Sequence, residues 1–351
     1  MVYVLLLNRL KSISGGVERM VVNYANFLTA EGNDVVVITL EKKSGLPFYS
    51  LHNEVQYFGL GKISLEEKSS IPESIKRLRN LRSLVKILSP DYLIAFQFGP
   101  YKIAALSTLL LGQRVVLMER NSPQRHNYVS EGSSVFRSIW LILAYRIAVQ
   151  FPEYIQYYPR LFRAKMIVSR NFTEIESKIS ARTMCTDILF VGRYGFQKDT
   201  DRVFKVFNYL APFLPHINFH MIGDGLKEHY VSRFQNVKIH MPLENWHEVG
   251  LQPIVVLLSR FEGCPNVFLE AMSLGIPCFG LHGVDGIHSL LMDDRGFLSK
   301  NKDIDEIGND LRLYIMDAEL SNRHRLNAYE YVQTFHEKTT VVSEFLVDLH
   351  G

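Results

Sequence analysis

The sequence has few of the residues that build disulfide frameworks or metal clusters. Its 351 residues include three cysteines, Cys185, Cys264 and Cys278, an odd number without metal-ligand spacing. A disulfide-stapled secreted domain and a zinc module are therefore excluded, and a cytoplasmic location is the simpler expectation. No metal is expected.

Long hydrophobic runs are also missing. The run at residues 2–7 reads as a buried strand, and the apolar stretch at 139–149 is interrupted by Arg146. Both are far shorter than the roughly 20 residues that a spanning helix needs. The sequence predicts no transmembrane segment.

Motifs for two further classes are lacking. We find no helix-turn-helix, zinc-finger or RNP-type pattern, so no nucleic acid partner is expected. No G-x-G-x-x-G fingerprint follows a predicted strand, which disfavours an NAD enzyme. The shorter Gly15-Gly16 and Gly223-Asp224-Gly225 turns still permit close backbone approach to a phosphate, although turns alone explain them.

What the chain does contain is an alternation of β-rich runs and amphipathic helical segments. The pattern predicts an α/β fold with two parallel-sheet, Rossmann-like domains, since one ordinary core does not accommodate 351 residues. The predicted strands fall in two sets, at 2–7, 34–40, 91–96, 114–119 and 164–169, then at 187–192, 218–223, 237–240 and 253–259.

Charge is divided unevenly between the two halves. Residues 1–165 contain 21 Lys and Arg against 12 Asp and Glu, a net charge of +9, whereas the remainder contains 18 against 24, a net of −6. The basic half favours an anionic partner. The segment at 74–88 interleaves apolar and basic residues at helical spacing, which fits an anionic membrane surface or, more simply, a surface helix packed on a sheet.

A second informative stretch is "FEGCPNVFLEAMSLGIPC" at 261–278. It follows a predicted strand, and Pro265 suits the first position of a helix. Ligands of open α/β sheets gather at this edge, and a helix N-terminus there attracts anions. Glu262 in the turn and Glu270 in the helix would flank such an anion. Two acceptors in these positions suit a nucleotide sugar, which has hydroxyls on both sides of a diphosphate. The plain alternatives are that Glu262 is a capping acid and Glu270 a solvated helix residue.

This stretch resembles the E-x7-E signature of the family 4 retaining glycosyltransferases. "FVGRYGFQKDTDRVFKVF" (190–207) resembles the family's segment in which an arginine and a lysine hold the donor diphosphate. The Gly-Gly loop, the "MIGDG" segment, the loop "GVDGIHSLLMDDRGFLS" and the last helix resemble further parts in the same order. The resemblance covers nearly the whole chain.

The resemblance implies a GT-B fold, with two Rossmann-like domains facing across a cleft. Residues 1–168, joined by a C-terminal helix at about 331–351, would form the acceptor domain, and residues 169–330 the nucleotide-sugar domain. Such enzymes do not rely on a metal-binding DxD motif, and no cofactor is expected beyond the donor. Retaining transfer in this family is viewed as front-face attack, with a departing phosphate oxygen taking the acceptor proton.

Site roles also follow from the resemblance, position by position. Glu262 would bind hydroxyls of the transferred sugar, Glu270 the ribose hydroxyls, and Arg193 with Lys198 the diphosphate; Glu262, Arg193 and Lys198 are the predicted catalytic residues. The Gly16 backbone would approach the diphosphate from the other domain. The remaining predicted donor-binding residues are Gly223, Gly225, Gly263, Cys264, Asn266 and Val267.

One departure from the family pattern points to the acceptor. "MERNSPQRHNY" (118–128) stands where many relatives have a histidine motif, and it resembles a bacterial subgroup that extends polyprenyl-diphosphate-linked oligosaccharides, commonly from N-acetylhexosamine donors. Arg120 would contact acceptor phosphate or act as a structural ion-pair residue, and His126 would approach the acceptor or be an ordinary loop histidine. The candidate acceptor residues are Gly15, Arg120, Asn121 and His126.

The resulting expectation is a hexosyltransferase of bacterial lipopolysaccharide, O-antigen or other polysaccharide assembly. It would move a sugar from a nucleotide sugar, chiefly a UDP-sugar, to a lipid-diphosphate-linked saccharide, and bind peripherally to the inner face of the cell membrane. One alternative is a GT-B phosphorylase or synthase acting on a soluble acceptor. The other is a catalytically silent scaffold of a polysaccharide-assembly complex.

Overall fold

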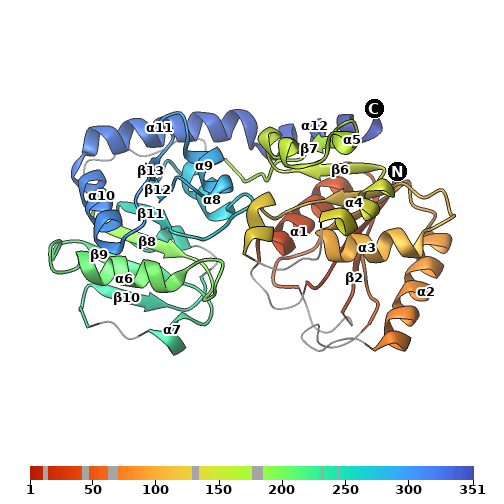
Figure 1. The fold of residues 1–351 in the computed structure, drawn as a ribbon, viewed down its shortest axis with the longest axis horizontal. Coiled ribbons are helices and arrows are strands. Elements are labelled where there is room, and N and C mark those ends of the chain that lie inside the picture. Colours follow the sequence, from red (N-terminus) through yellow and green to blue (C-terminus); the bar gives the residue numbers. More distant parts are fainter. Residues whose placement is uncertain are drawn as a thin grey trace. The chain divides into compact units, whose positions relative to one another are not determined.

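The chain forms two compact units. The computed structural model describes residues 1–10, 15–41, 47–61, 70–128, 134–175, 185–230, 233–243 and 246–351. Unit 1 contains residues 1–170 and 342–351, and unit 2 contains residues 171–341 (Figure 1). Both units are α/β, so the predicted fold class of two parallel-sheet, Rossmann-like domains is confirmed.

Unit 1 is built on a seven-stranded sheet in the order β3-β2-β1-β4-β5-β6-β7, with every described strand pair parallel. Its elements are β1 (Val2–Leu7), α1 (Gly16–Ala30), β2 (Asp34–Thr39), β3 (Gln56–Gly59), α2 (Ile71–Leu88), β4 (Tyr92–Phe96), α3 (Phe98–Ser107), β5 (Val115–Met118), η1 (Pro123–Asn127), α4 (Ser134–Ile142), β6 (Arg146–Val149), η2 (Pro152–Tyr157), α5 (Arg160–Arg163) and β7 (Met166–Val168).

Unit 2 is built on a six-stranded sheet in the order β10-β9-β8-β11-β12-β13, again parallel throughout the described pairs. Its elements are β8 (Asp187–Val191), α6 (Thr200–Leu210), β9 (Asn218–Ile222), α7 (Leu226–His229), β10 (Val237–His240), η3 (Trp246–Glu248), β11 (Pro253–Leu257), α8 (Asn266–Ser273), β12 (Cys278–Leu281), α9 (Asp285–Leu291), β13 (Phe297–Ser299), α10 (Ile304–Met316) and α11 (Ala318–Phe335).

Both sheets are doubly wound. In unit 1 the chain leaves β1 toward β2 on one side and continues from β4 to β5 on the other, so right-handed connections place α1 and α3 on opposite faces. Strands covered on both faces must be apolar along their whole length, and β1 and β4 are accordingly buried almost throughout. The order reverses between β1 and β4, and between β8 and β11 in unit 2.

The last helix, α12 (Lys338–His350), supplies residues 342–351 to unit 1. Phe345 is fully buried, with its ring 5.6 Å from that of Tyr24 in an edge-on arrangement. Near the end of the chain, His350 Nε2 lies 3.1 Å from the hydroxyl of Tyr3. A helix from the C-terminal end of the sequence therefore packs into the core of unit 1.

Four strands were not predicted from the sequence: β3, β6, β12 and β13. Two are short edge strands, and β12 contains Gly280, which weakens a strand pattern. The fourth, β6, lies inside the apolar stretch 139–149 that was considered only as a membrane candidate. Across the described ranges, no helix has the length and apolar character required to cross a membrane.

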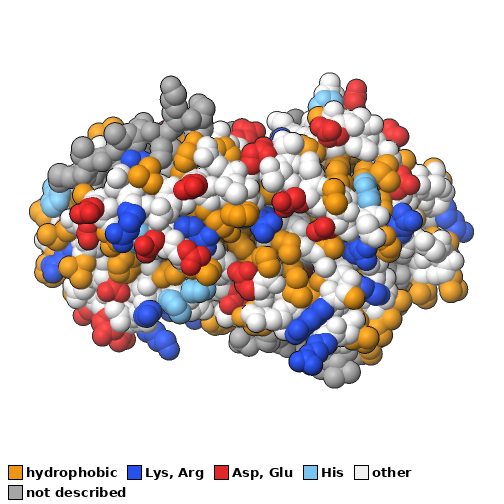
Figure 2. All heavy atoms as spheres, turned by 90° about the horizontal axis from the view of Figure 1, so that it is seen from above, with side chains coloured by type: hydrophobic (Ala, Val, Ile, Leu, Met, Phe, Trp, Pro, Cys, Tyr) orange, Lys and Arg blue, Asp and Glu red, His pale blue; other side chains and the backbone are white. Residues whose placement is uncertain are grey.

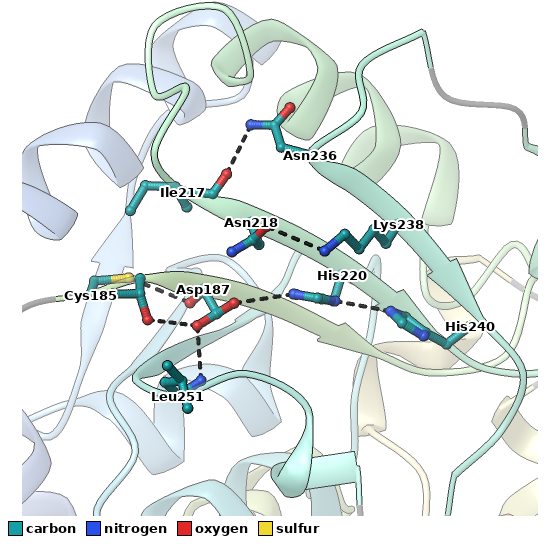
Figure 3. A network of polar contacts seen from close by, with 10 residues as sticks. Cys185, Asp187, Ile217, Asn218, His220, Asn236, Lys238, His240 and Leu251 are labelled. Carbon is teal, nitrogen blue, oxygen red and sulfur yellow. Dashed lines mark hydrogen bonds and ion pairs between the residues drawn. The ribbon is translucent and has the colours of Figure 1, made fainter.

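A buried polar chain crosses the sheet of unit 2 (Figure 3). His220 on β9 places Nε2 3.2 Å from Oδ1 of Asp187 on β8 and Nδ1 2.9 Å from Nε2 of His240 on β10. The other oxygen of Asp187 accepts from the backbone N–H of Leu251 and the hydroxyl of Thr186. The bonds between Asp187, His220 and His240 link the neighbouring strands β8, β9 and β10. The bonds to Asp187 also supply the partners that a buried carboxylate needs to remain charged.

Candidate functional site

The candidate donor site lies at the carboxyl edge of the unit 2 sheet, where the strand order reverses. The loop after β8 carries Arg193 and Lys198, and the loop after β11 carries Glu262. At such a reversal the neighbouring loops turn to opposite faces of the sheet and leave a crevice in which open α/β folds bind ligands. Tertiary structure thus brings two separate sequence motifs to one place.

Glu262 is the most tightly held of the predicted residues. Its side chain is 7% exposed, and its Oε1 lies 2.8 Å from Nζ of Lys198 and accepts the hydroxyl of Ser259 at 2.7 Å. The amide of Gln197 donates to Oε2 at 3.4 Å. The sequence predicted a carboxylate open to sugar hydroxyls, whereas in the structure Glu262 already orients the predicted phosphate-binding lysine.

The two loops are tied together beyond this ion pair. The backbone N–H of Arg260 donates to the Gln197 carbonyl at 2.8 Å, and its guanidinium reaches Asp199 Oδ1 at 3.1 Å. Asp199 is buried and has a φ of +45°, in the left-handed region that residues other than glycine rarely adopt. Sequence reasoning missed Gln197 and Ser259 as partners of Glu262. The signal available for Ser259 was its position three residues before Glu262, at the end of the predicted strand.

The Gly-Asp-Gly turn after β9 packs on the loop that carries Arg193. Gly192 donates its N–H to the Ile222 carbonyl at 2.9 Å, and Tyr194 donates to the Asp224 carbonyl at 2.8 Å. A Cβ at Gly223 would overlap the carbonyl oxygen of Gly192, and one at Gly225 (φ +74°) would lie 3.1 Å from Cβ of Tyr194. Gly223 is needed for the close approach of the two backbones, and Gly225 adopts a left-handed conformation beside the Tyr194 side chain, while the Arg193 side chain remains exposed.

The start of α8 is anchored by a residue outside the family motif. Nδ2 of Asn171 donates to the Cys264 carbonyl at 3.0 Å and to Oδ1 of Asn266, and the Asn171 carbonyl lies 2.6 Å from Nδ1 of His336. Pro265 is the N-cap rather than the predicted first helical residue, and α8 begins one position later. Gly263 lies beside Gly286 of α9, and Val267 is half-buried.

Glu270 lies in the second turn of α8. Its Oε2 accepts the indole N–H of Trp246 at 2.6 Å, and the indole is buried. No sequence pattern predicted this pair, since Trp246 lies on a separate segment before β11. Within the described part of the chain, no group of three or more His, Cys, Asp or Glu residues is arranged to hold a metal ion.

The predicted acceptor residues lie in unit 1. Gly15 is the N-cap of α1 and Gly16 its first residue. Arg120 is buried: its guanidinium donates to the Ser169 carbonyl at 2.7 Å and to the Ser169 hydroxyl at 2.9 Å, and it lies over the Tyr24 ring. These contacts brace the ends of β5 and β7, and a role toward the acceptor stays a prediction.

Two other predicted acceptor residues follow Arg120. Asn121 is half-buried, and His126 lies in η1, with its side chain outside the described residues.

Sequence reasoning missed Gln97, which follows β4 at the strand-order reversal. Its φ is +74°, and its side-chain oxygen accepts from Asn8 at 3.4 Å. A non-glycine residue in this conformation at a ligand-binding edge is a further candidate for substrate contact.

The doubly wound units and the polar residues at the carboxyl edge of unit 2 define an α/β enzyme of the two-unit GT-B type. Comparison with known families agrees in both units. Residues 171–331 match the family described as glycosyl transferases group 1, and residues 14–153 match glycosyltransferase family 4. The chain belongs to these glycosyltransferases and is a transferase enzyme.

Individual proteins show the same likeness. An uncharacterized glycosyltransferase of Haemophilus influenzae is 26% identical over 343 residues, which cover 91% of this chain and 93% of the relative. The lipopolysaccharide 1,6-galactosyltransferase of Salmonella typhimurium is 31% identical over 115 residues, 29% of this chain and 32% of the relative. The structure of Anabaena HepE with UDP-glucose has a TM-score of 0.76 at 14% identity, covering 99% of both chains.

Proposed function

We propose that the protein is a retaining glycosyltransferase that takes a hexose or N-acetylhexosamine from a UDP-sugar. The acceptor is a lipid-diphosphate-linked saccharide in the assembly of lipopolysaccharide or another bacterial surface polysaccharide, at the inner face of the cell membrane. The name of the Salmonella relative and the UDP-glucose in HepE support the pathway class and the donor class. The segment at 118–128 resembles that of a subgroup that extends diphosphate-linked oligosaccharides, and this resemblance supports a diphosphate-linked acceptor.

The observation that carries the donor role is the contact between Lys198 and Glu262 at the reversal of strand order. A lysine is a point charge on a flexible stem, and the 2.8 Å ion pair fixes its ammonium group at the edge where α/β folds bind ligands. Exposed Arg193 belongs to the same loop, and α8 begins four residues after Glu262. Two cations and a helix N-terminus suit a diphosphate.

In the proposed reaction the bond between the anomeric carbon and the UDP oxygen breaks as the acceptor hydroxyl attacks from the same face. The acceptor proton passes to the departing phosphate oxygen, so no separate base is required. Lys198 and Arg193 stabilise the charge that develops on UDP, which is the principal electrostatic task of the reaction. Glu262 holds Lys198 and accepts hydroxyls of the sugar, while Glu270 accepts those of the ribose.

On the acceptor side, we assign the lipid-linked substrate to unit 1. Gly15, Arg120, Asn121 and His126 are the proposed contacts, and Gln97 joins them. The net charge of +9 over residues 1–165 favours the diphosphate and an anionic bilayer. On the face drawn in Figure 2, Lys and Arg side chains are interspersed with Asp and Glu, so that face offers no uniform basic field among the described residues.

The first experiment is nucleotide release from a panel of UDP-, GDP- and ADP-sugars, with membrane lipid extract as the acceptor. We compare wild type with Glu262→Ala and with Glu306→Ala, an exposed glutamate of α10 that serves as the matched control. Release from a UDP-sugar is expected for wild type and the control. Loss of the Glu262 carboxylate is expected to lower the rate by about 100-fold or more, the scale of removing one charge-stabilising group.

Other outcomes separate the alternatives. Nucleotide release that requires only a free sugar as the acceptor would contradict the lipid-linked acceptor and favour the phosphorylase or synthase that acts on a soluble one. Intact UDP binding without release from any donor would contradict the proposed acceptor, and absence of UDP binding would favour a scaffold over an enzyme.

A further inference from the structure

The Glu270 carboxylate is held by an indole. Nε1 of Trp246 lies 2.6 Å from Oε2 of Glu270, and Trp246 is 3% exposed. An indole N–H only donates hydrogen bonds, and a bond to an ionised carboxylate is shorter and stronger than one between neutral groups. Trp246 comes from η3, before β11, whereas Glu270 comes from α8, after β11. The contact therefore ties together two segments on either side of one strand.

Holding the Glu270 side chain against the indole has an entropic cost. A glutamate side chain on a helix otherwise samples several rotamers, and fixing it loses conformational freedom. A rigid, buried ring fixes one carboxylate oxygen in space, and a carboxylate is able to accept several hydrogen bonds. The ring itself is set by packing, with His247 in an edge-on arrangement 5.9 Å away.

We propose that Trp246 is a positioning residue for recognition of the nucleotide ribose, acting through Glu270. This inference rests on the proposed function, in which Glu270 accepts the ribose hydroxyls. Two adjacent hydroxyls on a five-membered ring are fixed donors, and a carboxylate matches them only when its plane is held in one orientation. Trp246 thus makes the site selective for ribonucleotides over 2′-deoxyribonucleotides.

The test compares the binding of UDP and 2′-deoxy-UDP by calorimetry. Trp246→Phe keeps a buried aromatic ring and removes only the N–H donor. In wild type we expect UDP to bind at least about tenfold more tightly than 2′-deoxy-UDP, the scale of a hydrogen bond to a charged group. In Trp246→Phe we expect UDP to lose most of that advantage while 2′-deoxy-UDP binds nearly as before.

The matched control is Trp140→Phe, because the sequence has two tryptophans and Trp140 lies on α4 in unit 1. This variant is expected to discriminate as wild type does. It also leaves Trp246 as the only indole of the protein, so the NMR resonance of its Nε1 proton can be assigned directly. UDP is expected to shift this resonance more than 2′-deoxy-UDP does, a signature that an indole with a structural role alone would not give.

The outcomes separate the inference from its premise. If wild type does not bind UDP, the proposed function is wrong. If it binds both nucleotides equally, the ribose role of Glu270 is wrong. If wild type discriminates and Trp246→Phe discriminates equally, the positioning role alone is overturned. The resonance measurement in Trp140→Phe decides the matter even where Trp246→Phe folds poorly: equal shifts with both nucleotides would contradict the inference.

Discussion

At the scale of single residues, Ser259 controls how firmly Glu262 is held. Its side chain is fully buried and donates to Oε1 of Glu262 at 2.7 Å. We predict that Ser259→Ala lowers kcat/KM roughly tenfold, because a hydrogen bond to a charged group contributes about 1.5 to 3 kcal/mol and part of it orients Lys198. Steady-state kinetics with the preferred donor provide the measurement.

The control for this variant is Ser107→Ala. Ser107 is also a buried serine, but it bonds a helix carbonyl in unit 1. It is expected to leave kcat/KM unchanged; an equal loss in both variants would mean that general destabilisation, rather than the position of Glu262, accounts for the effect.

Residue-scale electrostatics also predict a pH dependence of stability. Burial lowers the pKa of His220 and outweighs the opposing effect of Asp187, while Lys238 lowers it further. The pKa of His240 is lowered by burial and by His220, Lys227 and Lys238. In both cases the unfolded chain, with a pKa of about 6.5, takes up protons first as the pH falls. Stability is therefore expected to decline below about pH 6.5.

This dependence can be measured by urea unfolding at about pH 7.5 and about pH 5.5. His240→Gln removes one titrating group and retains an amide that can bond His220, so its loss of stability on acidification is expected to be smaller than that of wild type. Exposed His216→Gln is the control. A loss in His240→Gln as large as in wild type would show that the acid sensitivity arises elsewhere.

At the scale of elements, the approach of two loops at the donor site depends on Gly223. Its φ is +158°, and a Cβ there would overlap the backbone of Gly192. Gly195, in the neighbouring loop, has a φ of +157° with open space around it. We predict that Gly223→Ala lowers the free energy of unfolding by about 2 kcal/mol more than Gly195→Ala, since the two differ chiefly in the backbone clash.

Urea unfolding of both variants measures this difference, and UDP calorimetry adds a functional comparison. Gly223→Ala is expected to weaken UDP binding because the displaced loop carries Arg193. Equal effects of the two substitutions would indicate that backbone conformation, and not the close approach, determines the requirement for glycine.

At the scale of the whole molecule, the uneven charge predicts different responses to salt. The proposed attraction of residues 1–165 to an anionic membrane would act across solvent and be screened within about 8 to 10 Å at moderate ionic strength. The Lys198–Glu262 pair is largely buried and screened less. Raising salt from about 50 mM to about 500 mM is therefore expected to release the protein from anionic vesicles more than it weakens UDP binding.

Vesicle sedimentation and calorimetry at the two salt concentrations test this expectation. Neutral vesicles are the control for attraction that does not depend on charge. An equal loss of both interactions would contradict the proposed division of roles between a basic acceptor half and a donor unit.

The sequence by itself determined the strands that are buried on both faces. Continuous apolar runs such as β1, β4 and β11 have no other stable environment in a compact α/β unit, so their pattern predicts them. The spacing of Glu262 and Glu270, with Arg193 and Lys198 in register, likewise identified the family. Edge strands such as β3 and β13 were missed, because a short, partly exposed strand is defined by its neighbour in the sheet.

Only the tertiary structure decided which side chains meet. Lys198 and Glu262 come from different loops, and the reversal of strand order between β8 and β11 sets them 2.8 Å apart. Trp246, which precedes β11 in the chain, bonds Glu270, which follows it, and Arg120 turns inward to Ser169. Local sequence carries no record of such pairings, because they depend on strand order and helix placement that many separate parts of the chain fix together.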